Sequence, residues 1–125
     1  MTPGADVASG TELERLLARL RRFRDDRDWS QFHTAKDLAI SVSVEAGELL
    51  ELFQWRRENE AADEALVEKA RGEAADVFLY LLLLCDQLGL DLIAAAEAKI
   101  DRNEQRFPVD KAFGVAKPED ASGSR

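Results

Sequence analysis

The segment SVSVEAGELLELFQW, residues 41–55, is the most informative part of this chain for its fold. Wound as an α-helix, it places leucine and valine side chains along one face, and Glu45 and Glu48 fall within that face or at its edge. A second segment repeats the pattern, because Glu73 and Asp76 share a helical face with leucine, valine and tyrosine side chains. Acids on a core face are rare unless they are paired or bind a metal. The two segments are therefore predicted to form an antiparallel helix pair that carries the functional site.

Four carboxylates converge if these two helices face each other. At ~5 Å and an effective dielectric of about 20, each like-charge pair would cost about 3 kcal/mol, so the cluster needs a cation. Hard oxygen ligands suit magnesium, and manganese is also possible. Two other interpretations stay open. The acids could lie on ordinary solvated faces, since E-x-x-E occurs by chance in many helices. A di-iron bundle would use Glu-x-x-His on two helices, whereas this chain has a single histidine and neither motif.

The totals are those of one ordinary globular domain, with 125 residues of which 46% are hydrophobic and 34% charged. A net charge of -8 argues against a general binder of nucleic acid or of anionic membranes. An anionic small substrate remains possible if metal ions accompany it. The single cysteine, Cys85, excludes a disulfide framework, and a cytoplasmic location is expected. No signal peptide is recognised, and the longest apolar run, residues 77–85, is too short to span a bilayer.

Hydrophobic periodicity predicts an all-α fold of four helices. The polar face of the first helix carries Arg15, Arg19, Arg21 and Arg22, most of which are expected to be solvated. Start and stop signals set the boundaries. The first predicted helix covers residues 12–26 and follows a capping box of Thr11 and Glu14. The second begins at Thr34 and ends at residue 55 or 57. The third runs from residue 63 or 64 to residue 88, just before Gly89, and the fourth lies between Asp91 and Pro108.

The run VFLYLLLL, residues 77–84, is apolar on every side. A helix without a polar face cannot be covered by a domain this small, so the run is predicted to pack against another subunit. The rest of the organisation follows from composition. Residues 1–10 are expected to be a disordered amino-terminal segment, residues 11–113 one folded domain, and residues 114–125 a flexible tail.

These segments together resemble the MazG-like all-α nucleoside triphosphate pyrophosphohydrolases, in particular the dCTP pyrophosphatase branch. The resemblance covers about residues 23–109 and rests on RDWSQFHTAKDLAISVSVEAGELLELFQW, RGEAADVFLYLLLL and KIDRNEQRFP. The signature of that family is E-E-x-x-E followed after a spacer by E-x-x-D. Here Val44 stands at the first acidic position, which puts a mechanism with a fifth carboxylate there in doubt. The candidate ligands that remain are Glu45, Glu48, Glu73 and Asp76.

The resemblance implies magnesium-dependent hydrolysis of a (deoxy)nucleoside triphosphate, with dCTP or a modified dCTP preferred, to the monophosphate and pyrophosphate. Metals that bridge the triphosphate to the carboxylates would orient the phosphates and lower the pKa of a bound water. A glutamate would accept the proton of that water, and Glu48 is the preferred candidate. The family also implies a homotetramer and a role in nucleotide-pool sanitation. The alternative is a protein of another functional class, a non-catalytic helical oligomerisation or regulatory module that has kept the fold.

The resemblance also implies a set of substrate-binding residues. Lys99, Asn103 and Arg106 match K-x-x-x-N-x-x-R and would meet the phosphates or the sugar. Without the family, Arg106 could equally compensate the carboxyl end of its helix, and the aromatic residues could belong to the core. Family positions around the base are matched by Trp29, His33, Trp55 and Tyr80.

Trp55 lies about 15 Å along the helix axis from Glu45, too far to reach a base whose phosphates bind at Glu45. We therefore hypothesise a site shared between subunits. One subunit would give the carboxylates, Tyr80 and Lys99, and a neighbour would give Trp55 or the loop of residues 29–33. Because stacking discriminates poorly among bases, a preference for cytosine requires hydrogen bonds to the base edge. The nearest candidates for those bonds are His33 and Asn103.

Overall fold

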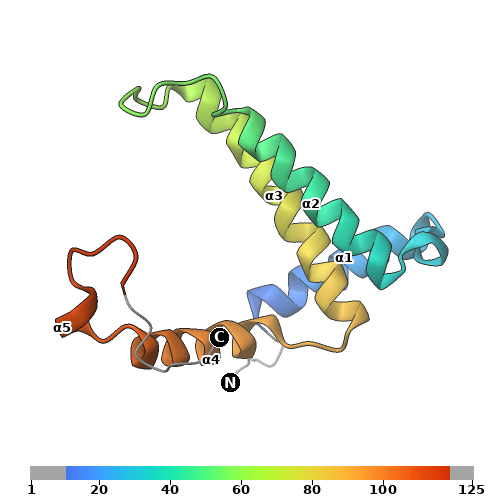
Figure 1. Ribbon diagram of the computed structural model, residues 1–125. Coiled ribbons are helices and arrows are strands. Elements are labelled where there is room, and N and C mark those ends of the chain that lie inside the picture. The colour runs from blue at the N-terminus through green and yellow to red at the C-terminus, as the bar shows by residue number, and fades with distance from the viewer. Residues whose placement is uncertain (1–10, 119–125) are drawn as a thin grey trace. The chain divides into compact units, whose positions relative to one another are not determined.

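The computed structural model describes residues 11–118, and these residues contain helices and no β-strand (Figure 1), which confirms the all-α fold class. The amino-terminal segment expected to be disordered, and residues 119–125 of the expected tail, lie outside this range. The chain divides between Gly89 and Leu90 into two compact units, which we describe separately. In chain order the elements are α1 (Glu12–Asp26), the 3₁₀ helix η1 (Trp29–Phe32), α2 (Ala35–Glu51), α3 (Glu64–Gln87), α4 (Leu92–Arg106) and α5 (Val109–Ala112).

The first unit begins with the capping box predicted for α1. The backbone N–H of Glu14 donates to Oγ1 of Thr11 at 3.1 Å, and the N–H of Thr11 donates to Oε1 of Glu14 at 2.8 Å. Two backbone donors that a helix end leaves unpaired are thereby satisfied. After α1 the chain turns through Asp28, which has a left-handed backbone (φ 55), into η1. This turn carries Trp29 and His33 toward α3.

Helices α2 and α3 lie side by side and form the core of this unit (Figure 1). Each begins at the residue expected from the sequence. Thr34 accepts a hydrogen bond from the N–H of Asp37 at 3.1 Å, and Asp63 accepts one from the N–H of Leu66 at 2.8 Å. Caps of this kind stabilise a helix by about 1 kcal/mol each. The buried side chains of the described residues are Leu38, Leu66, Leu82, Leu83 and Cys85.

The prediction that the second helix continues to residue 55 or 57 is wrong, because α2 ends at Glu51. Beyond it the backbone makes i to i−3 hydrogen bonds, from Phe53 N–H to the Leu50 carbonyl at 2.9 Å and from Arg56 N–H to the Phe53 carbonyl at 3.1 Å. Such bonds tighten the chain into turns and satisfy carbonyls that a helix end leaves free. Trp55 therefore stands on a turn, with 88% of its surface exposed.

The ends of α3 and α4 agree with the sequence prediction. Gly89 takes a left-handed backbone (φ 65) just after α3, which is the usual glycine stop. Asp91 accepts a hydrogen bond from the N–H of Ala94 at 3.0 Å and starts α4, which ends before Pro108. All four expected helices are therefore present. Short α5, after Pro108, and η1 were not expected as separate elements.

The apolar run of residues 77–84 is partly covered by its own chain. Leu82 is only 3% exposed and Leu83 is also buried, whereas Phe78 is 41% exposed. Only the exposed side of α3 is therefore available to pack against another subunit, and this packing stays a prediction. Within residues 11–118, no single helix has the length and apolar content needed to cross a membrane, and only α3 and α4 taken together, as an interrupted pair, would meet those criteria.

Candidate active site

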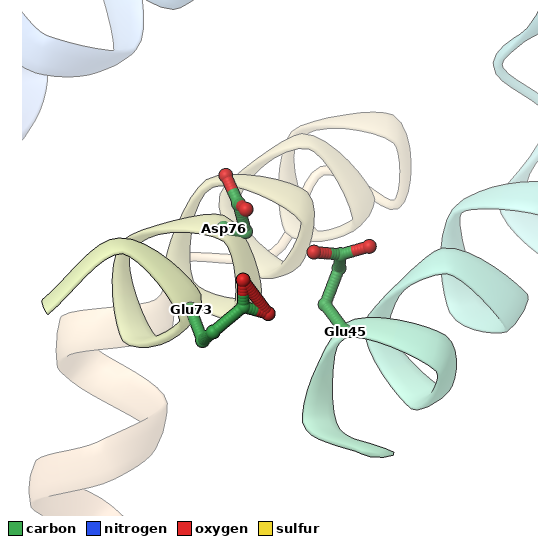
Figure 2. Close-up of side chains that lie close together, drawn as sticks. All are labelled: Glu45, Glu73 and Asp76. Carbon is green, nitrogen blue, oxygen red and sulfur yellow. The ribbon is translucent and has the colours of Figure 1, made fainter. Parts of the chain in front are cut away.

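Three of the four predicted carboxylates converge between α2 and α3. Figure 2 shows Glu45 reaching from one helix toward Glu73 and Asp76 on the other. One carboxylate oxygen from each residue lies within 4.8 Å of the other two. Two oxygens on opposite sides of one cation, each about 2.0–2.6 Å from it, would be separated by a similar distance. The three side chains can therefore ligate a single divalent cation.

One oxygen of this cluster has a strong need for a partner. Oε2 of Glu73 is buried and accepts no hydrogen bond from any of residues 11–118. Leaving such an acceptor unsatisfied costs about 1–3 kcal/mol. Carboxylate oxygens are the donors that magnesium and manganese prefer, so the chemistry of these residues fits a hard cation.

Glu48, the fourth predicted ligand, is exposed and is not one of the three residues that converge. It lies one turn beyond Glu45 on α2 and still acts on the cluster through its charge. Desolvation, followed by the charges of Glu48 and Asp76, raises the pKa of Glu45 to about 7. Desolvation, followed by the charges of Glu48 and Asp76, also raises the pKa of Glu73, and Glu51 adds a smaller contribution. Repulsion of this kind is what a bound cation would relieve.

A pocket of about 210 Å³ opens beside the carboxylates, with Asp76 in its wall. Most of this wall is apolar or aromatic, and the rings of Phe23 and Trp29 meet edge to face with centroids 5.7 Å apart. Its full lining comes from α1, the η1 segment and α3, and consists of Leu20, Phe23, Arg24, Trp29, His33, Asp76, Leu79, Tyr80 and Leu83.

This pocket collects three of the predicted substrate-binding residues, Trp29, His33 and Tyr80, within one chain. The alternative in which the loop of residues 29–33 reaches the site only from a neighbouring subunit is therefore wrong for this wall. The reason is the left-handed turn at Asp28, which brings η1 back against α1 and beside α3. Nδ1 of His33 is buried and has no hydrogen-bond partner in the described part of the chain.

The remaining predicted residues lie elsewhere. Trp55 is not part of the pocket wall. In the second unit, Lys99 and Arg106 line an open hollow along α4 together with Arg102, and Asn103 is half-buried on the same helix. The hollow is rich in cationic side chains, which suits phosphate binding.

Sequence reasoning missed the contribution of α1 to the pocket, and Arg24 in particular. The available signal was Asp86, an acid directly after the apolar run of residues 77–85, since a carboxylate at such a place needs a cationic partner. In the structure Nε of Arg21 donates to Oδ2 of Asp86 at 3.0 Å, and Nη1 of Arg24 lies 3.8 Å from the same oxygen. Arg21 belongs to the group of four arginines of which most were expected to be solvated, and it joins α1 to α3.

The chain is similar to known proteins in sequence and in structure. Residues 40–119 match the MazG-like family. Mouse dCTP pyrophosphatase 1 is 40% identical over 98 residues, which are 75% of this chain and 58% of the mouse protein. For human dCTP pyrophosphatase 1 the identity is 36% over 94 residues, 72% of this chain and 55% of the human protein. The chain thus spans little more than half the length of these curated relatives.

A solved structure agrees with these relatives. The crystal structure of a pyrophosphatase from Archaeoglobus fulgidus superposes with a TM-score of 0.70 at 43% sequence identity. The match covers 79% of this chain and 94% of the archaeal one.

Proposed function

This chain belongs to the MazG-like family, and we propose that it hydrolyses a (deoxy)nucleoside triphosphate, dCTP or a modified dCTP in first place, to the monophosphate and pyrophosphate. The observation that carries the proposal is the convergence of Glu45, Glu73 and Asp76 at the edge of an aromatic pocket. A nucleotide has the same two parts, an anionic triphosphate that needs cations and an apolar ring that needs a flat wall. The similarity to mouse and human dCTP pyrophosphatase 1 supports the choice of base.

Glu45, Glu73 and Asp76, with Glu48 as a fourth ligand, would hold Mg²⁺, for which Mn²⁺ could substitute. The all-oxygen donor set and the unpartnered oxygen of Glu73 support a hard cation. When bound, the cation would offset the charge of the triphosphate and make the α-phosphorus more electrophilic.

The residues of the chain divide the remaining tasks. A water attacks the α-phosphorus, the bond to the bridging oxygen breaks, and pyrophosphate leaves. Glu48 is the proposed acceptor of the proton from that water, because it is exposed and lies one turn from Glu45. Trp29 and Tyr80 provide ring surfaces for the base, with His33 at its edge. Donors for the phosphates or the sugar come from Lys99, Asn103 and Arg106.

The proposal includes the assembly and its setting. We infer a homotetramer in which α2 and α3 form an antiparallel central pair, because Ile40, Val44 and Phe78 leave apolar surface exposed on these two helices. Sanitation of the nucleotide pool would place the protein in the cytoplasm. Its partner is a nucleoside triphosphate, and the net charge of -8 disfavours nucleic acid or an anionic membrane as a partner.

The test is product analysis over a panel of deoxy- and ribonucleoside triphosphates, with magnesium or with EDTA. We expect pyrophosphate and dCMP in equal amounts from dCTP, and no product in EDTA. A matched pair of variants shows where the activity resides: Glu45→Gln should be inactive, whereas Glu68→Gln, an exposed position on α3 outside the cluster, should be active. Release of orthophosphate in place of pyrophosphate would reject the reaction, and no cleavage of any nucleotide would favour the non-catalytic module.

A further inference from the structure

Arg24 is a charged side chain in the pocket wall that the proposed catalysis does not use. The other formally charged residue in that wall, Asp76, belongs to the carboxylate cluster. Only 17% of the Arg24 side chain is exposed. A guanidinium so withdrawn from water requires acceptors, and it offers strong donors to any ligand in the pocket.

Contacts with α3 place Arg24 toward the end of the pocket that is farther from the metal ligands. Nη1 of Arg24 lies 3.8 Å from Oδ2 of Asp86. Asp86 follows Asp76 by ten residues on the same helix, which corresponds to about 15 Å along its axis. A nucleotide whose phosphates bind at Asp76 would extend its base in the direction of Arg24.

Two carboxylates orient the guanidinium and leave part of it available. Nε donates to Oδ1 of Asp25 at 2.8 Å, and Nη2 donates to Oδ2 of Asp25 at 3.3 Å. Asp86, on the Nη1 side, is held in turn by Arg21. Arginine carries five N–H donors, and Arg24 makes no further hydrogen bond to any of residues 11–118. Nη1 and Nη2 therefore each keep a free donor.

We propose that Arg24 selects cytosine by donating hydrogen bonds from Nη1 and Nη2 to O2 and N3 of the base. The inference rests on the proposed function and names the residue that decides which base is accepted. O2 and N3 of cytosine are neighbouring acceptors, which the fork of an arginine matches in a bidentate manner. In uracil and thymine N3 carries a hydrogen, so a donor would face a donor and one polar group would be left unpaired.

The experiment compares binding of dCMP and dUMP by isothermal titration calorimetry, and kcat/KM for dCTP and dUTP, in the full chain with magnesium. Two variants remove the fork in different ways: Arg24→Gln removes the charge, and Arg24→Lys keeps it. We expect wild-type protein to prefer cytosine over uracil in both measurements. In both variants the ratio of the two affinities, and the ratio of the two kcat/KM values, should fall about tenfold. Arg22→Gln is the matched control, since Arg22 is an exposed arginine of α1 outside the pocket wall, and it should retain the preference. Thermal melts establish that each variant is folded.

The outcomes separate this inference from the proposed function. If wild-type protein releases pyrophosphate from dCTP and either Arg24 variant keeps the preference, the inference is overturned and the function stands. If no nucleotide is cleaved but the preference for dCMP over dUMP is lost in both variants, the inference stands and the function fails. Absence of a cytosine preference in wild-type protein, or an equal loss for both bases, overturns the inference, because an equal loss indicates a role in phosphate binding or folding.

Discussion

A carboxylate oxygen of Glu45 on α2 lies within 4.8 Å of one from Asp76 on α3. The two acids are this close only when the two helices pack together. Their repulsion, added to the desolvation of Glu45, is a cost that the folded state carries and the unfolded chain does not. A bound cation or a bound proton lowers this cost and so stabilises the packed helices.

Magnesium is expected to stabilise the protein in the absence of substrate. At about 100 times its dissociation constant, a ligand that binds only the folded state adds about 2.7 kcal/mol to the free energy of unfolding. Thermal melts followed by circular dichroism measure the effect, and Glu45→Gln should reduce it. Melting temperatures that do not change up to tens of millimolar magnesium would contradict a shared metal site.

Without metal, stability should fall as the pH rises. Desolvation, followed by the charges of Glu48 and Asp76, raises the pKa of Glu45 from its ordinary 4.5 to about 7, so between these values the folded protein binds more protons than the unfolded chain. The free energy of unfolding therefore decreases through this window. Melts in EDTA at about pH 5 and about pH 8 provide the measurement.

A control separates this effect from other titrating groups. Glu45→Gln cannot ionise at that position and should melt with a weaker dependence on pH. Arg21 beside Asp86 lowers the pKa of that carboxyl, so its contribution is lost only at more acidic pH and does not enter the window. Equal slopes for the variant and the wild type would mean that Glu45 is not the group responsible.

Removal of one carboxylate charge should abolish pyrophosphate release without unfolding the chain. Asp76→Asn and Glu45→Gln keep the shape of the side chain and weaken metal binding. Mutation of residues that only support metal ligands lowers metal affinity or activity by about 10- to 100-fold. Loss of a ligand itself should therefore lower pyrophosphate release by more than ~100-fold. Helical circular dichroism should be unchanged. Near-normal turnover in both variants would mean that these residues are not the metal ligands.

Light scattering at micromolar concentration should give a mass near four times 13.9 kDa. Phe78→Glu should weaken this assembly, because it introduces a charge at an apolar position of α3 that the single chain leaves exposed. Lys69→Glu, at an exposed polar position of the same helix, is the control. A monodisperse monomer of the wild-type protein would remove the assembly from the proposal.

Sharing of the site between subunits can be tested by mixing inactive variants. Trp55 is exposed and lies outside the pocket of its own chain, so it is the residue that a neighbour would contribute. If Glu45→Gln and Trp55→Ala are each inactive, mixed oligomers should recover activity. No recovery despite demonstrated exchange of subunits would place the whole site within one chain.

The helices could be predicted from the sequence, because the signals that start and stop a helix are local. The capping residues Thr11, Thr34, Asp63 and Asp91 act on backbone groups three residues away, and Gly89 stops α3 through its own backbone angles. The spacing of the acids was also readable, since three residues along a helix place two side chains on one face. The end of α2 was not readable, because its last residues are good helix formers and only the turn toward α3 shortens it.

Which side chains contact one another across the helices could be seen only in the folded chain. Arg21 and Asp86 are 65 residues apart, and no periodicity relates them. Glu48 lies one turn from Glu45, yet only Glu45 belongs with Glu73 and Asp76 to the group whose oxygens lie within 4.8 Å of one another, whereas Glu48 is exposed and acts on Glu45 and Glu73 from beside that group. Contacts of this kind depend on how α1 and α2 pack against α3, and that packing is a sum over many side chains that no local pattern records. The same reason explains why the pocket, and Arg24 within it, became visible only in the folded chain.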